Sequence, residues 1–128
     1  MTPDIETTPA RLLRADELLR DCRAQDVHPL SQLLMAFDAI YLCCLVATAE
    51  PSSQEGTVLH PDPDVVLSAK KQLRLSPENI DLILRLMQWS FYAFGDELPC
   101  VPEDAVALAH EVVARAHVLQ RDVEGMKA

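Results

Sequence analysis

The chain has 128 residues, 49% of them hydrophobic, and its 20 acidic against 11 basic residues give a formal net charge of −9. This length suffices for one domain whose core needs neither a metal nor a disulfide. The negative charge disfavours nucleic acid and membrane surfaces as partners, and no run of lysine or arginine indicates a basic pocket. With only three glycines, the chain offers little room for the tight turns of an all-β fold or for a phosphate-binding loop.

The first helix is predicted to begin at Ala10, after a flexible tail at residues 1–9 that contains two prolines. Apolar residues then recur at the spacing of one helix face: Leu12, Ala15, Leu19 and Cys22. Charged residues occupy the opposite face. The pair His28-Pro29 marks a break, because proline disfavours helix at the residue before it.

The second helix is predicted over residues 30–49 and is apolar on nearly every face, with Asp38 as its single charge. Its length of about 20 residues would suit a membrane span. The charge in its middle and the absence of flanking basic residues argue against a span. A helix buried at the centre of a bundle explains the pattern better, so no membrane association is expected.

Two more helices have clear start signals. Asp62, followed by a proline, begins a short helix over residues 63–73, because aspartate caps a helix and proline suits its first turn. Ser76, again followed by a proline, begins a strongly apolar helix over residues 77–94. Gly95 ends that helix, at the place where a left-handed cap is usual.

The last helix starts at Pro102 and is acidic in its first turn, as the helix dipole prefers. No segment alternates in the manner of a strand. The sequence therefore predicts an all-α domain over residues 10–124, an up-and-down bundle of about five helices. The two apolar helices, 30–49 and 77–94, lie at its centre and one helix is short. Residues 125–128 are predicted to form a C-terminal tail.

The cysteines and histidines show no spacing typical of a metal site. Adjacent Cys43 and Cys44 point in different directions from a helix, so they are poorly placed to bind one ion. His110 and His117 lie about 10 Å apart along a helix, which is too far for one ion. The sequence predicts neither a metal site nor a cofactor. Reduced cysteines and an N-terminus without a signal-peptide pattern favour a cytoplasmic location.

Charged residues within the two apolar helices form the candidate site. Asp38 lies in the second helix, and Asp81 and Arg85 lie four residues apart in the fourth, a spacing that allows pairing. Arg85, Trp89 and Tyr92 share a helix face, which could hold an anion or a ring. The alternative interpretation is structural: Arg85 pairs with Asp81 or Asp38, because a buried charge needs a partner.

The order of the elements resembles the HEPN helical bundle, whose name stands for "higher eukaryotes and prokaryotes nucleotide-binding". Two long helices, a proline-rich loop with a short helix, an apolar helix and an amphipathic helix begun by Pro-Glu-Asp carry the resemblance over about residues 10–120. It implies a homodimer, because such domains commonly pair through their central helices. The apolar excess of helices 30–49 and 77–94 independently favours such a partner surface.

Ribonucleases of that family carry an arginine followed, after about four to six residues, by a histidine on a late helix. This chain has Arg85 followed by Tyr92, so a tyrosine stands where the family has its histidine. A formal match between Arg23 and His28 lies at a helix end before a proline and is interpreted as chance. The departure argues against ribonuclease activity.

Three functions follow from these patterns. The first is a non-catalytic bundle that acts through homodimerisation, by helices 30–49 and 77–94, and through binding another protein. The second is an RNA-cleaving or nucleotide-binding protein of the HEPN type that uses Arg85 and Tyr92, although the charge makes nucleic acid an unexpected partner. The third is an acidic chaperone for a secreted or toxic partner.

Overall fold

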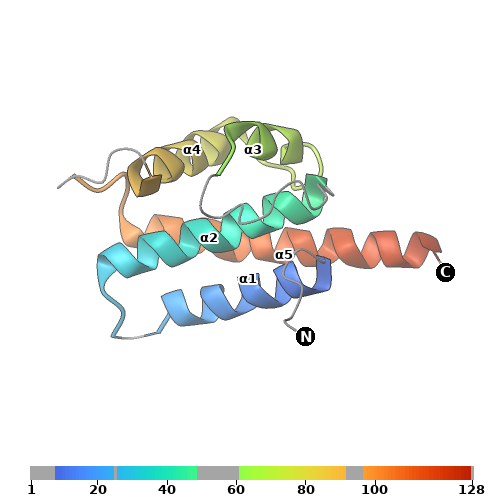
Figure 1. The fold of residues 1–128 in the computed structure, drawn as a ribbon, viewed down its shortest axis with the longest axis horizontal. Helices are drawn as coiled ribbons and strands as arrows, with labels where there is room; N and C mark the ends of the chain where they lie inside the picture. The colour runs from blue at the N-terminus through green and yellow to red at the C-terminus, as the bar shows by residue number, and fades with distance from the viewer. Residues whose placement is uncertain (1–7, 25, 49–60, 92–96, 128) are drawn as a thin grey trace.

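A computed structural model of the chain describes residues 8–24, 26–48, 61–91 and 97–127. These residues form five α-helices and no strand: α1 (Thr8–Cys22), α2 (Pro29–Thr48), α3 (Pro63–Ala69), α4 (Pro77–Phe91) and α5 (Pro102–Lys127) (Figure 1). The predicted all-α bundle with one short helix is confirmed. The starts of α3, α4 and α5 agree with the prolines and capping residues that predicted them.

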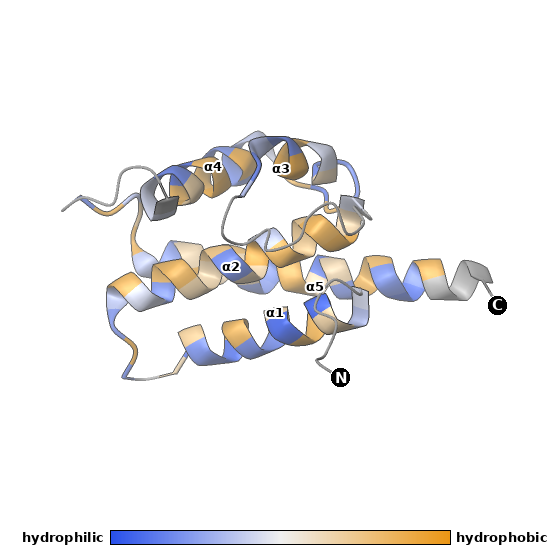
Figure 2. Ribbon diagram, viewed as in Figure 1, coloured by the Kyte–Doolittle hydropathy of each residue, from blue (hydrophilic) through white to orange (hydrophobic). Residues whose placement is uncertain are grey.

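Helix α2 forms the centre of the bundle. It packs against each of the other four helices, with α1 on one side and α3 and α4 on the other (Figure 1). Eleven of its 20 residues are buried, and the hydropathy colouring shows how apolar it is along most of its length (Figure 2). By length and composition α2 could cross a membrane, but its apolar side chains are packed against this chain's own helices.

Helix α4 lies at the edge of the bundle and differs from the predicted second central helix. One stripe of its surface is exposed to solvent and carries Glu78, Asp81, Arg85 and Gln88. The opposite face is buried and carries Ile83, Leu86 and Met87, and Trp89 is buried at the border of the exposed stripe. Helix α4 is therefore amphipathic, because its few polar residues recur at helical spacing and gather on one side. The long α5, rather than α4, lies beside α2.

Side-chain caps fix the starts of α3 and α4. The Asp62 carboxylate accepts a hydrogen bond from the Asp64 backbone N–H at 2.9 Å. At α4 the Ser76 hydroxyl accepts from the Asn79 N–H, and the Asn79 side-chain carbonyl accepts from the Ser76 N–H, both at 3.0 Å. Such reciprocal bonds satisfy N–H groups that have no partner inside the helix. Both starts were predicted from the sequence.

The outer helices extend beyond the predicted domain bounds. Helix α1 begins at Thr8 rather than Ala10, with Pro9 in its first turn, where a missing N–H costs nothing. Helix α5 continues to Lys127, so residues 125–127, predicted as a tail, are helical. Pro9, which suggested a tail, is equally compatible with the first turn of a helix.

The chain turns sharply after α3, where residue 74 adopts a left-handed conformation. Arg74 has a φ of 53°. The Leu75 N–H donates to the Lys70 carbonyl at 2.9 Å, and the Arg74 N–H donates to the Lys71 carbonyl at 3.4 Å. These two bonds are those of a Schellman motif, the commonest way to end a helix with a left-handed residue. Leu73 and Leu75 are buried on either side of Arg74, so the turn is anchored in the core.

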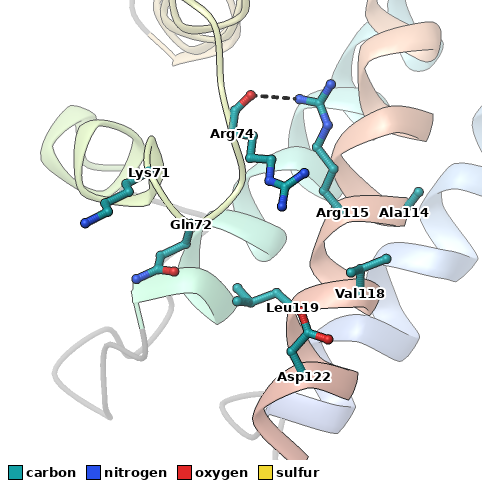
Figure 3. A pocket seen from close by; sticks show the side chains of 8 residues that line it. All are labelled: Lys71, Gln72, Arg74, Ala114, Arg115, Val118, Leu119 and Asp122. Carbon is teal, nitrogen blue, oxygen red and sulfur yellow. Dashed lines mark hydrogen bonds between the residues drawn. The ribbon is translucent and has the colours of Figure 1, made fainter.

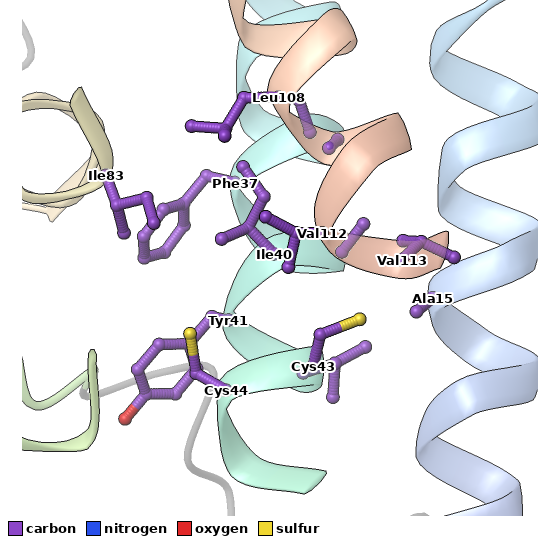
Figure 4. Packing of buried hydrophobic residues seen from close by; sticks show 14 of the residues in the cluster. Ala15, Phe37, Ile40, Tyr41, Cys43, Cys44, Ile83, Leu108, Val112 and Val113 are labelled. Atoms are coloured by element: carbon purple, nitrogen blue, oxygen red, sulfur yellow. The ribbon is translucent and has the colours of Figure 1, made fainter. Parts of the chain in front are cut away.

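The core is built around aromatic residues of α2. Phe37 and Tyr41 are fully buried, and their rings stack with centroids 5.9 Å apart. Figure 4 shows Phe37 beside Ile83 of α4 and Leu108 of α5. The Tyr41 hydroxyl accepts a hydrogen bond from the Asp62 N–H at 2.9 Å. Helix α2 therefore also positions Asp62, the N-cap residue of α3.

The cap at α4 leads to a first prediction. Replacing Ser76 by alanine is expected to lower the free energy of unfolding by about 1 kcal/mol, because the Asn79 N–H loses its acceptor. Urea denaturation followed by circular dichroism measures this change. Ser68, exposed within α3, is the matched control, and its replacement by alanine is expected to change stability by less than about 0.5 kcal/mol. Equal effects at the two serines would contradict the capping role.

Candidate functional site

Two of the predicted site residues, Arg85 and Asp81, form an ion pair on the surface of α4. The Arg85 Nε lies 3.0 Å from the Asp81 carboxylate, and both side chains are more than half exposed. The Arg85 guanidinium also donates to the Pro99 carbonyl at 3.0 Å. It therefore tethers the segment before α5 to α4. An exposed pair of this kind contributes about a few tenths of a kcal/mol to the free energy of unfolding. Pairing with Asp81, the alternative to a binding role, accounts for this contact of Arg85.

The predicted face of Arg85, Trp89 and Tyr92 is not open along its described length. Trp89 is buried, with 4% of its surface exposed, whereas Arg85 is exposed. The two side chains one helical turn apart thus lie in different environments. Tyr92 lies outside the described residues. The structure brings Arg85 to Asp81 and Pro99, and Trp89 to the core.

The charge that acts on Asp38 is Arg14 of α1, whereas Arg85 pairs with Asp81. Burial raises the pKa of its carboxyl to about 6, although the positive charge of Arg14 on α1 acts in the opposite direction. Desolvation therefore outweighs the attraction of the nearby charge. The sequence identified Asp38 correctly as an unusual charge, but its partner of opposite sign comes from α1 rather than from α4.

His117 joins two helices, and Cys43 and Cys44 are part of the core. The His117 Nε2 lies 2.8 and 3.1 Å from the two carboxylate oxygens of Asp16, which joins α5 to α1. Cys43 and Cys44 are buried thiols. Burial raises the pKa of Cys43 well above its ordinary value and that of Cys44 to about 12. Within the described residues, no three histidine, cysteine or acidic side chains are grouped to hold a metal ion.

The most distinctive hollow lies where the turn after α3 meets α5, and we call it the corner pocket. Its volume is about 410 Å³, within the range of ligand-binding cavities. Its walls come from two segments far apart in the sequence (Figure 3). The lining residues are Lys71, Gln72 and Arg74 from the turn, and Ala114, Arg115, Val118, Leu119 and Asp122 from α5.

The corner pocket is cationic although the chain is acidic. Lys71, Arg74 and Arg115 contribute three positive charges and Asp122 one negative charge, so the local balance is +2 against −9 for the whole chain. Ala114, Val118 and Leu119 give it an apolar floor, and Val118 is 47% exposed. An apolar floor with positive charges at its rim suits a ligand that is both apolar and anionic.

No run of lysine or arginine indicated this pocket, although three of its lining residues are basic. The segment Lys70-Lys71-Gln72-Leu73-Arg74 contains three of the 11 basic residues within five positions. That local signal was available in the sequence. Arg115, by contrast, lies 41 residues from Arg74, and nothing in the sequence indicates that α5 brings it to the same place.

Arg115 holds the turn in place against α5. Its guanidinium donates to the backbone carbonyls of Leu73 at 3.4 Å and Arg74 at 3.2 Å, and it reaches the Asn79 side chain at 3.5 Å. The same side chain lies 3.7 Å from the Glu111 carboxylate. Figure 3 shows the bond to the Arg74 carbonyl. Arg115 is therefore mainly a positioning residue, which leaves Lys71 and Arg74 as the exposed positive charges of the pocket, beside the exposed carboxylate of Asp122.

The conformation of Arg74 has an energetic cost. A residue with a side chain is less stable than glycine in the left-handed region, by about 1 kcal/mol at a helix end. In this turn residue 74 contributes only its backbone N–H, to the Lys71 carbonyl, and its backbone carbonyl, to the Arg115 guanidinium, and glycine would supply both groups equally well. The turn itself therefore does not require an arginine.

A second hollow, of about 520 Å³, lies between the end of α1 and the first half of α5. Its charged lining has both signs, with Arg23 against Glu103 and Glu111, and His110 is exposed there. With one positive and two negative charges in its lining, this hollow lacks the gathering of basic residues that the corner pocket has. The corner pocket carries the clearer chemical signal.

Comparison of the chain with known proteins finds no matching family model, no matching curated protein and no matching solved structure. The resemblance to the HEPN bundle therefore stays a prediction of the sequence.

Proposed function

We propose that the chain is a non-catalytic interaction module that binds an acidic segment of another protein in the corner pocket. The observation that carries the proposal is the coincidence of two features in one cavity. Lys71 and Arg74 are exposed positive charges in its lining, and Arg74 extends toward α5 (Figure 3), where Val118 and Leu119 supply the apolar floor. A segment that bears both carboxylates and apolar side chains is complementary to both features.

A protein segment suits this pocket better than a nucleic acid does. A nucleic acid presents a long row of phosphates, and the net charge of −9 repels such a row beyond the pocket itself. A short acidic peptide carries little charge outside its contact. Its apolar side chains also gain from leaving water at Val118 and Leu119.

The corner pocket is not the partner surface that the sequence suggested. The predicted homodimer relied on unpartnered apolar faces of α2 and α4. The apolar residues of α2 are used in packing within the chain, and the exposed stripe of α4 is polar. We therefore propose the corner pocket, rather than α2 and α4, as the binding surface. The HEPN-type alternative that uses Arg85 and Tyr92 gains no support from the exposed Arg85–Asp81 pair.

Fluorescence anisotropy with a synthetic probe tests the proposal. The probe is a short labelled peptide of alternating glutamate and leucine, at low ionic strength. We expect the chain to bind it, and we expect Lys71→Glu with Arg74→Glu to weaken binding at least about tenfold, because two contacts become repulsive. A version of the peptide with glutamine for glutamate is expected to bind more weakly.

The matched control is Lys70→Glu with Arg121→Glu. It changes the net charge by the same amount, and both residues are exposed but do not line the pocket. We expect the control to weaken binding by less than about threefold, through long-range charge alone. Absence of binding by the unaltered chain, or equal losses in the two double variants, would refute the proposal. Tighter binding of a labelled single-stranded RNA at the same residues would replace it with a nucleic-acid function.

A further inference from the structure

We infer that Arg74 is the residue that recognises a carboxylate in the corner pocket, and that its left-handed backbone is retained for that contact. The inference rests on the proposed function and assigns the charge recognition to one side chain. Three observations support it: the backbone conformation of Arg74, the direction of its side chain, and the absence of a partner for that side chain within the described residues.

The backbone observation is that an arginine occupies a glycine position. In the Schellman motif after α3, residue 74 has a φ of 53°, in the region where glycine is favoured. The motif is completed by the bonds from Arg74 to Lys71 and from Leu75 to Lys70, none of which involves a side chain. Strain that the fold does not need is typical of functional positions.

The side-chain observation is that the left-handed turn places the guanidinium over the pocket. In Figure 3 the Arg74 side chain extends from the turn toward α5, on the side where Leu119 and Asp122 lie. No hydrogen bond or ion pair engages its guanidinium within the described part of the chain. The contacts of residue 74 with Arg115 use its carbonyl oxygen instead.

The chemistry of the guanidinium defines the ligand group. Arginine presents two parallel N–H donors that match the two oxygens of a carboxylate, which a lysine ammonium cannot do. Lys71 adds charge at the rim without this geometry. The corner pocket is thus expected to distinguish a glutamate or aspartate side chain from its amide, and most of that distinction is expected to come from Arg74.

The test compares Arg74→Gly and Arg74→Lys with the unaltered chain. We expect Arg74→Gly to raise the urea midpoint, because strain is relieved, and to weaken binding of the glutamate–leucine peptide about tenfold. The preference for glutamate over glutamine peptide is expected to fall at least about threefold in the same variant. Arg74→Lys keeps the strain and the charge, so we expect an unchanged midpoint and binding weakened several-fold. Lys70→Ala, which removes one positive charge outside the pocket, controls for net charge.

The outcomes separate the inference from the proposed function. If the unaltered chain does not bind the peptide, the proposed function fails and the inference fails with it. If the chain binds, and Lys71→Glu with Arg74→Glu abolishes binding while Arg74→Gly keeps both affinity and the glutamate preference, the inference alone is overturned. A lowered urea midpoint for Arg74→Gly would also overturn it, because the arginine would then be part of the fold.

Discussion

Replacing Asp38 by asparagine is expected to raise the free energy of unfolding by about 2 kcal/mol at neutral pH, and to leave it nearly unchanged in acid. Burial raises the pKa of Asp38 from 3.8 to about 6, a difference equivalent to about 3 kcal/mol. The side chain keeps some contact with solvent, which reduces the effect to about 2 kcal/mol.

The direction of this stability change follows from the pH range in which the folded chain keeps the Asp38 carboxyl protonated. Between about pH 4 and pH 6 the folded chain keeps the Asp38 proton and the unfolded chain has lost it, so stability falls as the pH rises through this window. Asparagine has no proton to lose. The difference between the variant and the unaltered chain should therefore develop across the same window.

Urea denaturation at a series of pH values measures this difference. Asp21→Asn, at an exposed position of α1, is the control, and we expect a small difference there at every pH. A variant Asp38→Asn that is no more stable than the unaltered chain at neutral pH would show that Asp38 is well solvated. A difference that is constant with pH would show that its effect is not electrostatic.

Truncation of Phe37 to alanine is expected to lower the free energy of unfolding by about 4 kcal/mol. Phe37 is fully buried and stacks on Tyr41, and it lies between α4 and α5 in the core (Figure 4). Its removal loses the burial of the ring and leaves a cavity that rigid neighbours fill only partly. A domain of this size is typically stable by about 5–15 kcal/mol, so the loss is severe.

Urea denaturation followed by circular dichroism checks this expectation. Leu67→Ala on α3 is the control, because Leu67 is 51% exposed, and its effect is expected to stay below about 0.5 kcal/mol. Should Phe37→Ala fail to fold, Phe37→Leu supplies a milder truncation with an expected loss of about 1–2 kcal/mol. Losses no greater than that of Leu67→Ala would contradict the central position of α2.

The parts of this fold that depend on neighbouring residues could be predicted from the sequence. Asp62 and Ser76 cap helices by bonds that span two or three positions, so their signals are local. The burial of α2 follows from its composition alone, since a helix that is apolar all round must be covered. The edge position of α4 differs from the predicted central one because the polar residues of this helix, Asp81 and Arg85 among them, form a single exposed stripe.

The corner pocket could be predicted only in part. Lys71 and Arg74 lie in a short basic segment, which is a local signal in the sequence. Arg115 reaches them through the packing of α5 against the turn, across 41 residues. Side chains brought together over such a separation leave no periodic trace in the sequence. The same reason explains why Asp38 was identified but its neighbour Arg14 was not.

The two adjacent thiols of α2 resist oxidation and alkylation only while the chain stays folded. Oxidation and alkylation proceed through the thiolate, and Cys43 and Cys44 are both buried and far from ionisation. Cys22 is buried as well, which leaves the half-buried Cys100 as the most accessible of the four. Damage to the other three must await an opening of the bundle. Any substitution that loosens the core will therefore also shorten the time for which its cysteines stay reduced.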